Sequence, residues 1–335
     1  MELKIIHVLS FLLLAVNQIA AYQPYDFDQY NETYVSSLRD VLDSFHVRLS
    51  AGIIPENTYA ADTHWNFDGN LVIGDVEWGK ALRSVVGPGG VFGDLNIPDY
   101  YQLVDGNICG TMYNLQGNQS GEFLGLPVQP GARFNVHGAE FWVFDQALEV
   151  NTLITVQPTG RIRAQFAGEI PVPPPVPRGS QNVQNQQTPQ TYRDARRKTL
   201  AAMHKNVMSG NPEANVVYAL NDVVVDDVGD IRTGKEAFVE IIAAQQQGLG
   251  AFPVKQIHDE YIIVDGRLGA VEYIWHGKQK EGYLGRAPND KMVRVRAMLW
   301  FEFDPAGMVE KVVSVHDEGV ILNQLEDNMG YMLYP

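Results

Sequence analysis

The residue pair with the clearest potential for acid–base chemistry lies near the C-terminus, where a valine-rich stretch leads into His316 and Asp317. The alternating pattern of residues 307–316 predicts a strand, and a carboxylate beside an imidazole at its end could transfer protons on a bound substrate. The sequence His-Asp-Glu-Gly is also typical of a capping or surface turn. Because neighbouring strand residues point to opposite faces, only one of the pair can face a pocket.

Glu272 and His276 form a second candidate pair. Glu272 lies on the strand predicted from 268 to 275, and His276 follows directly after it. Residues four apart on a strand share a face, so this carboxylate and this imidazole could polarise a substrate carbonyl together. The alternative is a polar outer face next to Lys278. Nearby aromatic residues are expected to form core or binding-pocket wall, since aromatic side chains mainly contribute buried area: Tyr273, Trp275 and Trp300.

The first half of the chain carries a third group of candidates. Asp62, His64 and Trp65 lie within four residues, and His137 and Glu140 follow on a later predicted strand. Two histidines and two carboxylates could bind a metal or a ligand, but none of them shows close ligand spacing such as HxxxH. No metal site is therefore predicted, and the first three residues are retained as candidate binding residues.

The elements that position these residues form an internal repeat. Three separated segments of the first half recur in the second half at a common offset of 160 residues, and this shared register indicates two copies of one domain. In the first copy, nothing after the predicted strand 148–157 corresponds to Asp317, so the sequence predicts a catalytic acid in the second copy only. The matching segments are Asp62, Gly69 and Gly74 with Asp222, Gly229 and Gly234; Val104-Asp105-Gly106 with Val264-Asp265-Gly266; and Phe123-Leu124-Gly125 with Tyr283-Leu284-Gly285.

Each copy begins with helices and continues with strands. Helical spacing of apolar residues predicts helices over 35–49 and 200–207, each followed by a glycine stop, and a second helix after each of Gly74 and Gly234. In the second copy, strands are predicted at 256–264, 268–275, 292–303 and 308–316. Helices followed by consecutive antiparallel strands predict an α+β domain, in which a sheet curls around its helices and leaves a pocket.

The segments outside the two copies predict how the chain is processed. Residues 1–21 combine a lysine, an apolar core and terminal small residues, which is typical of a secretory signal peptide cleaved near Ala21. Residues 171–190 are rich in Pro, Gln and Asn and predict a linker. The predicted order is signal peptide 1–21, first domain 22–170, linker 171–190 and second domain 191–335. A secreted chain would present Asn31 and Asn118, which begin glycosylation sequons, at its surface.

The composition excludes several classes of partner. A formal net charge of −15 argues against nucleic acid, because phosphate binding needs clustered Lys and Arg. No stretch after the signal peptide is long and apolar enough to span a membrane, so a soluble protein is expected. The single cysteine, Cys109, excludes an intramolecular disulfide. Stability must therefore come from an apolar core, for which 45% hydrophobic residues suffice.

The second copy resembles the SnoaL-like polyketide cyclase family in four segments, namely 282–285, 300–304, 307–310 and Asp317 followed by Gln324-Leu325. In the first copy, 110–111 and 121–127 are similar to the same family's turn-and-strand segment. The resemblance implies that both copies are cone-shaped α+β barrels of the nuclear-transport-factor-2-like superfamily, packed as an internal pseudo-dimer. It also implies Asp/His acid–base catalysis with no metal or organic cofactor.

The resemblance therefore implies a secreted enzyme for cyclisation, dehydration or isomerisation of a neutral, apolar, polyketide- or terpenoid-like molecule. Asp317 would be the base, and His316 or His276 would orient or protonate the substrate. The distance from Glu310 to Asp317 is one residue longer than the family pattern, so His316 is the alternative inward-facing residue. The second hypothesis is a non-catalytic binding protein for an apolar ligand. The third is a hydrolase that uses an Asp/Arg/Asp set, as epoxide hydrolases of this superfamily do, but no complete set is visible in the sequence.

Overall fold

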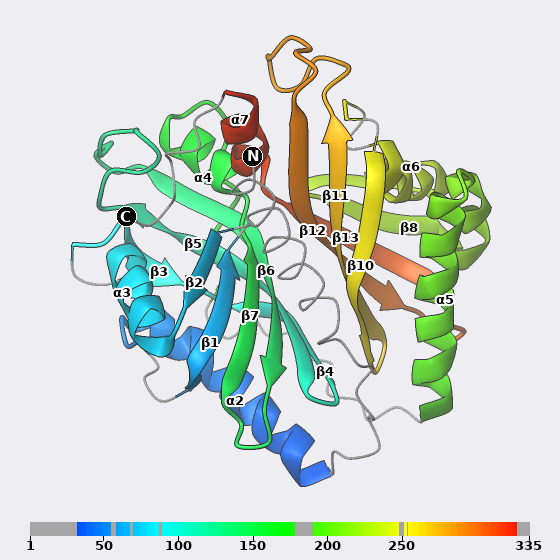
Figure 1. The fold of residues 1–335 in the computed structure, drawn as a ribbon, viewed down its shortest axis with the longest axis horizontal. Coiled ribbons are helices and arrows are strands. Elements are labelled where there is room, and N and C mark those ends of the chain that lie inside the picture. The colour runs from blue at the N-terminus through cyan, green and yellow to red at the C-terminus, as the bar shows by residue number, and fades with distance from the viewer. Residues whose placement is uncertain are drawn as a thin grey trace, which may run out of the picture.

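The computed structural model describes residues 32–54, 58–67, 70–86, 89–177, 190–247, 251–252 and 254–326. These residues form two units of helices and an open sheet, one before and one after the predicted linker (Figure 1). The predicted α+β class and the tandem arrangement are thereby confirmed. We call the unit before residue 171 domain 1 and the unit from residue 190 onward domain 2. Among the described residues, no helix is long and apolar enough to cross a membrane.

Domain 1 contains a seven-stranded sheet in the order β2-β1-β7-β6-β5-β3, with β4 paired to β5 beside that path. All of its strand pairs are antiparallel except β1 with β7, which are parallel. Its elements are α2 (Glu32–Ser50), β1 (Tyr59–Phe67), β2 (Asn70–Ile73), α3 (Asp75–Val86), β3 (Phe92–Asn96), β4 (Asp99–Asp105), β5 (Ile108–Gln119), β6 (Arg133–Phe144), β7 (Val150–Val156) and α4 (Thr159–Phe166).

Domain 2 repeats this plan in a six-stranded sheet with the order β10-β11-β12-β13-β8-β9. Here β8 and β13 form the parallel pair. The predicted run of consecutive antiparallel strands therefore holds for β10 to β13. It does not hold for β8, the first strand of the domain, which pairs with β13, the last. Its elements are α5 (Gln190–Met208), the 3₁₀ helix η2 (Pro212–Tyr218), β8 (Ala219–Asp227), β9 (Asp230–Thr233), α6 (Lys235–Gln247), β10 (Val254–Asp265), β11 (Leu268–Lys278), β12 (Met292–Phe303), β13 (Val309–His316) and α7 (Glu318–Leu325).

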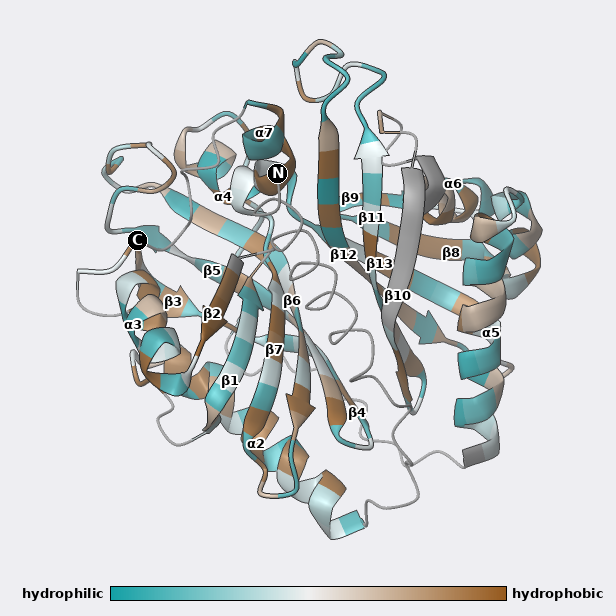
Figure 2. Cartoon of the chain, in the orientation of Figure 1, coloured by the Kyte–Doolittle hydropathy of each residue, from teal (hydrophilic) through white to brown (hydrophobic). Residues whose placement is uncertain are grey.

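Each domain buries one face of its sheet under its own helices. Bands of hydrophobic and hydrophilic residues alternate along α3 and α5, as expected for helices with one covered face (Figure 2). In domain 1 the apolar stripe of α2 and the Trp78 side of α3 pack on the sheet. In domain 2 a second core contains Leu200, Met203 and Phe238 from the helices and Trp275 from the sheet. The two cores are separate clusters.

The other faces of the two sheets pack against each other in a third apolar cluster, to which both domains contribute (Figure 1). Trp300 of β12 stacks on Tyr101 of β4 with ring centroids 6.2 Å apart, and it also contacts Phe141 of β6. At Gly110 of β5 a Cβ atom would lie 2.9 Å from the Trp300 ring and 2.9 Å from Ile263. The absence of a side chain at this glycine is what allows the sheets to approach so closely.

Two charged contacts at this interface are reciprocal. Asp105 of domain 1 accepts a backbone N–H of β10 at 2.9 Å and the guanidinium of Arg197 of domain 2 at 2.5 Å. Asp265 of domain 2 accepts a backbone N–H of β4 at 3.0 Å and the guanidinium of Arg39 of domain 1 at 2.5 Å. Asp105 and Asp265 are equivalent residues of the repeat. Such exchange of equivalent contacts is the pattern of a two-fold symmetric interface.

Candidate acid–base site in domain 1

Helix α2 places a histidine in the core of domain 1. Its apolar stripe consists of Leu38, Leu42, Phe45 and Leu49, all of which are buried. His46 lies four residues after Leu42 and eight after Leu38, so the helical repeat turns it to the same face. The imidazole is consequently only 2% exposed, and a buried imidazole requires hydrogen-bonding partners.

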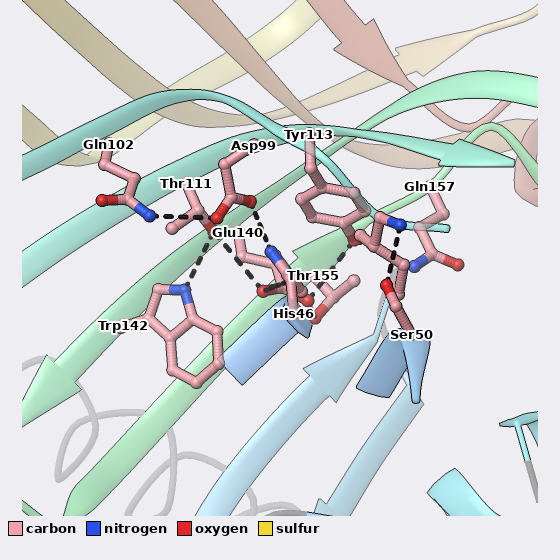
Figure 3. Close-up of polar contacts among 11 residues, drawn as sticks. His46, Ser50, Asp99, Gln102, Thr111, Tyr113, Glu140, Trp142, Thr155 and Gln157 are labelled. Atoms are coloured by element: carbon pink, nitrogen blue, oxygen red, sulfur yellow. Dashed lines mark hydrogen bonds and ion pairs between the residues drawn. The ribbon is translucent and has the colours of Figure 1, made fainter. Parts of the chain in front are cut away.

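Two carboxylates from β4 and β6, which both pair with β5, supply those partners (Figure 3). Nδ1 of His46 is 2.5 Å from Oδ1 of Asp99, the first residue of β4, and Nε2 is 3.4 Å from Oε2 of Glu140 in β6. The other oxygen of Asp99 accepts a hydrogen bond from Gln102 at 2.9 Å. Both carboxylates are buried. We call Asp99, His46 and Glu140 the acid–base cluster.

Two tryptophans orient hydroxyl groups toward Glu140. Trp65 donates its indole N–H to Oγ1 of Thr155 at 2.9 Å, and Thr155 donates to Oε1 of Glu140 at 3.2 Å. Trp142 donates to Oγ1 of Thr111 at 3.2 Å, and Thr111 lies 3.5 Å from Oε2 of Glu140. An indole N–H can only donate, so each threonine oxygen accepts it and turns its own hydrogen to the carboxylate. Glu140 is therefore placed as a hydrogen-bond acceptor for these hydroxyl groups.

Tyr113 of β5 provides a third hydroxyl at the cluster. Its O–H accepts a hydrogen bond from Gln157 at 2.9 Å and donates to Oε1 of Glu140 at 3.4 Å (Figure 3). The ring lies against Gly138 of β6, where an added Cβ would come within 2.5 Å of it. Glycine at 138 thus provides the space that holds the phenol beside the carboxylate.

The charges of the cluster follow from its geometry. Burial by itself lowers the pKa of His46, but the charge and hydrogen bond of Asp99, with a further contribution from Glu140, raise this pKa to about 10. His46 is therefore an imidazolium cation at neutral pH, and it cannot act as a base there. Burial, followed by the Glu140 charge, raises the pKa of Tyr113 well above its usual value. Tyr113 consequently stays a neutral hydrogen-bond donor.

A cavity in the helix-and-sheet core exposes one side of the cluster. His46, Tyr113, Glu140, Thr155 and Gln157 are its polar residues. Its space of about 50 Å³ is enough for a few water molecules, since one water needs roughly 10–15 Å³ by this measure. The remaining lining is apolar and largely aromatic: Phe45, Leu49, Trp65, Phe67, Trp78, Leu82, Val85, Val86, Phe92, Ile97, Leu115 and Leu153.

Among its described residues, domain 2 does not repeat the cluster. Glu140 pairs with Thr111 and Thr155 in the sheet, and the residue in the equivalent position, between β11 and β13, is Leu299. The equivalent of His46 on α5 is His204, which lines a space of only about 10 Å³ beside Leu299. The sequence placed the acid in the second copy only. In the structure, Glu140, the carboxylate that lines the aromatic cavity, belongs to domain 1.

Asp317 lies at the junction of the two domains, at the N-cap of α7. Its carboxylate accepts hydrogen bonds from the backbone N–H of Gly319 at 2.7 Å, from Thr159 Oγ1 at 2.5 Å and from the backbone N–H of Gly160 at 3.3 Å. Thr159 and Gly160 belong to α4 of domain 1. These are the contacts of a helix cap shared between domains. They agree with the capping turn that the sequence His-Asp-Glu-Gly offered as the alternative to a catalytic role. A catalytic role of Asp317 stays a prediction.

The other candidates of domain 2 lie on two faces of its sheet. His316 is buried, and Oγ of Ser314 lies 3.5 Å from its Nδ1. Glu272 is fully buried and forms an ion pair with Arg296. His276 is half-buried at the end of β11. Of the aromatic candidates, Tyr273 and Trp275 are part of the helix-and-sheet core. Trp300 is part of the interface between the two sheets.

The candidates of domain 1 are divided by the strand alternation of β1. Asp62 and His64 are exposed on its outer side, whereas Trp65 is buried and lines the cavity. Of the two sequons, Asn118 lies in β5 and Asn31 lies outside the described residues. Of the three candidate binding residues Asp62, His64 and Trp65, the structure thus brings only Trp65 to the cavity beside the acid–base cluster.

No protein-family model matches the chain, and no curated protein matches its sequence. Solved structures do match. Its structural neighbours include SnoaL-like polyketide cyclases. One such protein, from Jannaschia sp. CCS1, has a TM-score of 0.36 and 17% identity over 42% of this chain and 96% of its own. The family named by the sequence resemblance is thus also found among the structural neighbours.

Two further neighbours carry other descriptions. AclR from Streptomyces galilaeus, assigned as a hydroxylase, matches with a TM-score of 0.34 and 16% identity over 40% of this chain and 97% of its own. SalBIII, an epoxide hydrolase/cyclase-like enzyme in pyran ring formation, matches with a TM-score of 0.30 and 22% identity over 37% of this chain and 91% of its own. At these TM-scores the similarities support no functional conclusion, so the function proposed below rests on the geometry of domain 1.

Two signals for the acid–base cluster were present in the sequence. His46 lies on the apolar stripe of α2, where a histidine needs a partner, and Glu140 is a single carboxylate in the apolar run 139–144. The sequence suggested no role for Glu140 other than that of a metal or ligand contact. Asp99 gave no such signal, because its role depends on how β4 approaches α2.

Proposed function

We propose that domain 1 is an acid–base enzyme that removes a proton next to a carbonyl group of a neutral, mostly apolar small molecule. The observation that supports this proposal is the placement of the Glu140 carboxylate in an aromatic-lined cavity beside the cationic His46. Removal of such a proton starts cyclisation, dehydration and isomerisation alike. The final product class and a polyketide- or terpenoid-like substrate are part of the proposal and come from the sequence resemblance.

The protonation states assign the roles. Glu140 is the base: its carboxylate takes the proton, and the electron pair of the broken C–H bond moves into an enolate. Tyr113 and His46 both line the cavity as hydrogen-bond donors, and either can donate to the enolate oxygen where negative charge develops. Asp99 does not line the cavity among the described residues. It holds His46 in its cationic form, so it acts as a positioning residue.

The cavity also bears on the substrate. The cluster sets two carboxyl groups against one imidazolium, so it offers no excess positive charge to attract an anionic substrate. An aromatic wall suits a ring or an unsaturated chain. The present space of about 50 Å³ is smaller than the roughly 300–1,000 Å³ of sites for drug-sized ligands. A larger substrate therefore requires lining side chains to move, and the half-buried Val85 and Val86 at the end of α3 are our candidates for this movement.

Exchange of substrate hydrogen for deuterium tests the reaction class without knowledge of the product. The protein is incubated in D₂O with a panel of small neutral ketones and enones, and deuterium next to the carbonyl is measured by NMR and mass spectrometry. Glu140→Gln is expected to slow exchange by about 10²–10⁴-fold. Glu149→Gln, which changes an exposed carboxylate in the same domain, should leave the rate unchanged. Equal exchange in the Glu140→Gln protein would remove Glu140 from the mechanism.

A carrier is the second candidate function, and the observation in its favour is that Glu140 already accepts hydrogen bonds from Tyr113 and Thr155. Such a cluster can fix the polar end of a ligand without turnover. Binding of panel members to the wild-type protein, with no exchange above the rate in buffer, would replace the enzyme by a carrier.

The arrangement of the chain completes the proposal. We propose that the two domains act as an internal pseudo-dimer, supported by the reciprocal contacts of Asp105 and Asp265. Domain 2 would then stabilise domain 1 and not carry a second site. Secretion after cleavage near Ala21, the absence of nucleic-acid and membrane partners, and the absence of a cofactor stay predictions from the sequence.

A further inference from the structure

The beginning of the predicted linker is bound to the outer face of domain 1. Side-chain amides on three strands hold the backbone of residues 171–177: Asn135 donates to the carbonyl of Pro174 at 2.8 Å, and Asn96 to that of Val176 at 3.1 Å. Gln116 contacts Val176 twice, donating to its carbonyl at 2.6 Å and accepting its N–H at 2.9 Å. A proline-rich chain offers carbonyl acceptors but few N–H donors, and amides satisfy both. We call residues 171–177 the proline strap.

The proline strap leaves an open groove beside it. The groove has a space of about 970 Å³ and is lined by the strap itself and by the outer side of β3, β5 and β6. Farther from the strap contacts, the groove is lined by the polar residues Asp94, Asn118 and Arg133. This space lies near the upper end of the roughly 300–1,000 Å³ typical of ligand sites, and it is on the opposite side of the sheet from the acid–base cluster.

Asn118 is the acceptor of a sequon, and its position sets where an attached sugar would lie. It pairs with Arg133 in β6 and with Gly93 in β3. Its Nδ2 donates to Oδ2 of Asp94 at 2.7 Å, and Asp94 has a left-handed backbone, with φ of 50°, at an irregularity of β3. A glycosylated asparagine amide keeps one N–H, which can still donate to Asp94. Because Asn118 itself lines the groove, an attached sugar would begin there.

We propose that Asn118 is N-glycosylated and that the first sugars of its glycan occupy this groove. The groove offers the two kinds of contact that a saccharide needs. Its hydroxyl and N-acetyl groups meet the carboxylate of Asp94 and the exposed guanidinium of Arg133, while its apolar C–H face packs on the prolines of the strap. Sugar transfer to the unfolded chain precedes formation of β5, so the half-buried position of Asn118 is compatible with modification. The proposal requires that the chain enters the secretory pathway, where N-glycosylation takes place. It does not depend on the acid–base chemistry proposed for domain 1.

The test uses the full chain with its own signal peptide, expressed in a secreting eukaryotic cell as the Asn31→Gln variant, which leaves Asn118 as its single sequon. Glycopeptide mass spectrometry determines whether Asn118 is modified. Peptide-N-glycosidase F is then applied to the native and to the denatured protein. A glycan held in the groove is released at least about tenfold more slowly from the native protein, since release requires local opening.

Matched variants separate the groove from general crowding. Arg133→Ala should speed release from the native protein, whereas Arg83→Ala, which changes an exposed arginine of α3 outside the groove, should not. An unmodified Asn118 in the secreted protein would overturn the proposal. Release from the native protein at the rate of the denatured protein would also overturn it, because the glycan would then project into solvent.

Discussion

Replacement of Asp99 by Asn probes the charge of the buried histidine directly. The pKa of His46 rises from its usual 6.5 to about 10 in the folded protein, and each unit corresponds to about 1.36 kcal/mol. Protonation of His46 therefore contributes up to about 5 kcal/mol to the free energy of unfolding. Because the folded-state pKa is the higher one, this contribution is fully present below pH 6.5. It is lost as the pH rises through about 10.

Asp99→Asn keeps the shape and an acceptor for Nδ1 but removes the charge 2.5 Å away. The pKa of His46 should fall by about 1–3 units, and the free energy of unfolding at neutral pH by about 3–5 kcal/mol, because one partner of a buried ion pair is lost. Both effects follow from the same contact, so they should appear together.

Histidine-labelled NMR spectra recorded from pH 5 to 10 measure the first effect, and the His46→Gln variant identifies the signal among the eight histidines. Urea unfolding measures the second. As a control, Glu77→Gln removes one partner of the exposed pair with Lys80 and should cost no more than about 1 kcal/mol. A wild-type His46 that titrates near 6.5, or an Asp99→Asn protein with an unchanged His46 pKa, would refute the assigned charge state.

Two further predictions concern the contacts between the domains. Burial raises the pKa of Asp317 from its usual 3.8 to about 6, despite the hydrogen bonds that it accepts, so its ionisation should lower the free energy of unfolding by up to about 3 kcal/mol as the pH rises through that window. Asp317→Asn keeps the cap and should flatten this pH dependence while leaving carbonyl exchange intact; lost exchange would instead restore Asp317 as a catalytic residue. Asp265→Asn leaves Arg39 without its buried partner and should destabilise the chain by about 3–5 kcal/mol in urea unfolding. Glu240→Gln, at the exposed pair with Arg232, should change it by less than about 1 kcal/mol, and equal effects of these two changes would contradict an interface role for Asp265.

Much of the fold was predictable because apolar periodicity is local. The strand predicted at 292–303 matches β12 in both bounds, and the helix predicted from 35 to 49 lies within α2. The short helix α4 was not predicted, since 159–166 has a mixed composition and contains a glycine. Its stability depends on packing against the domain-1 core through Ile162 and Phe166 and on the contact of its first residues with Asp317.

The candidate site was less predictable, because its members are far apart in sequence. His46 and Asp99 are separated by 53 residues, and Glu140 comes from another strand. A local pattern identified His316 and Asp317 as neighbours, but adjacency in a strand turns two side chains apart. The residues that the fold brings together come instead from one helix and two strands that both pair with β5.

By itself, the sequence determined that the chain contains two related α+β domains joined by a proline-rich segment, since repeat register and apolar spacing are properties of the chain. It also determined that a carboxylate and a histidine lie on apolar faces at Glu140 and His46. Tertiary structure decided which carboxylate faces a cavity. It gave Asp317 to a helix cap between the domains and Asp99 to His46, because burial and charge depend on which distant elements pack together.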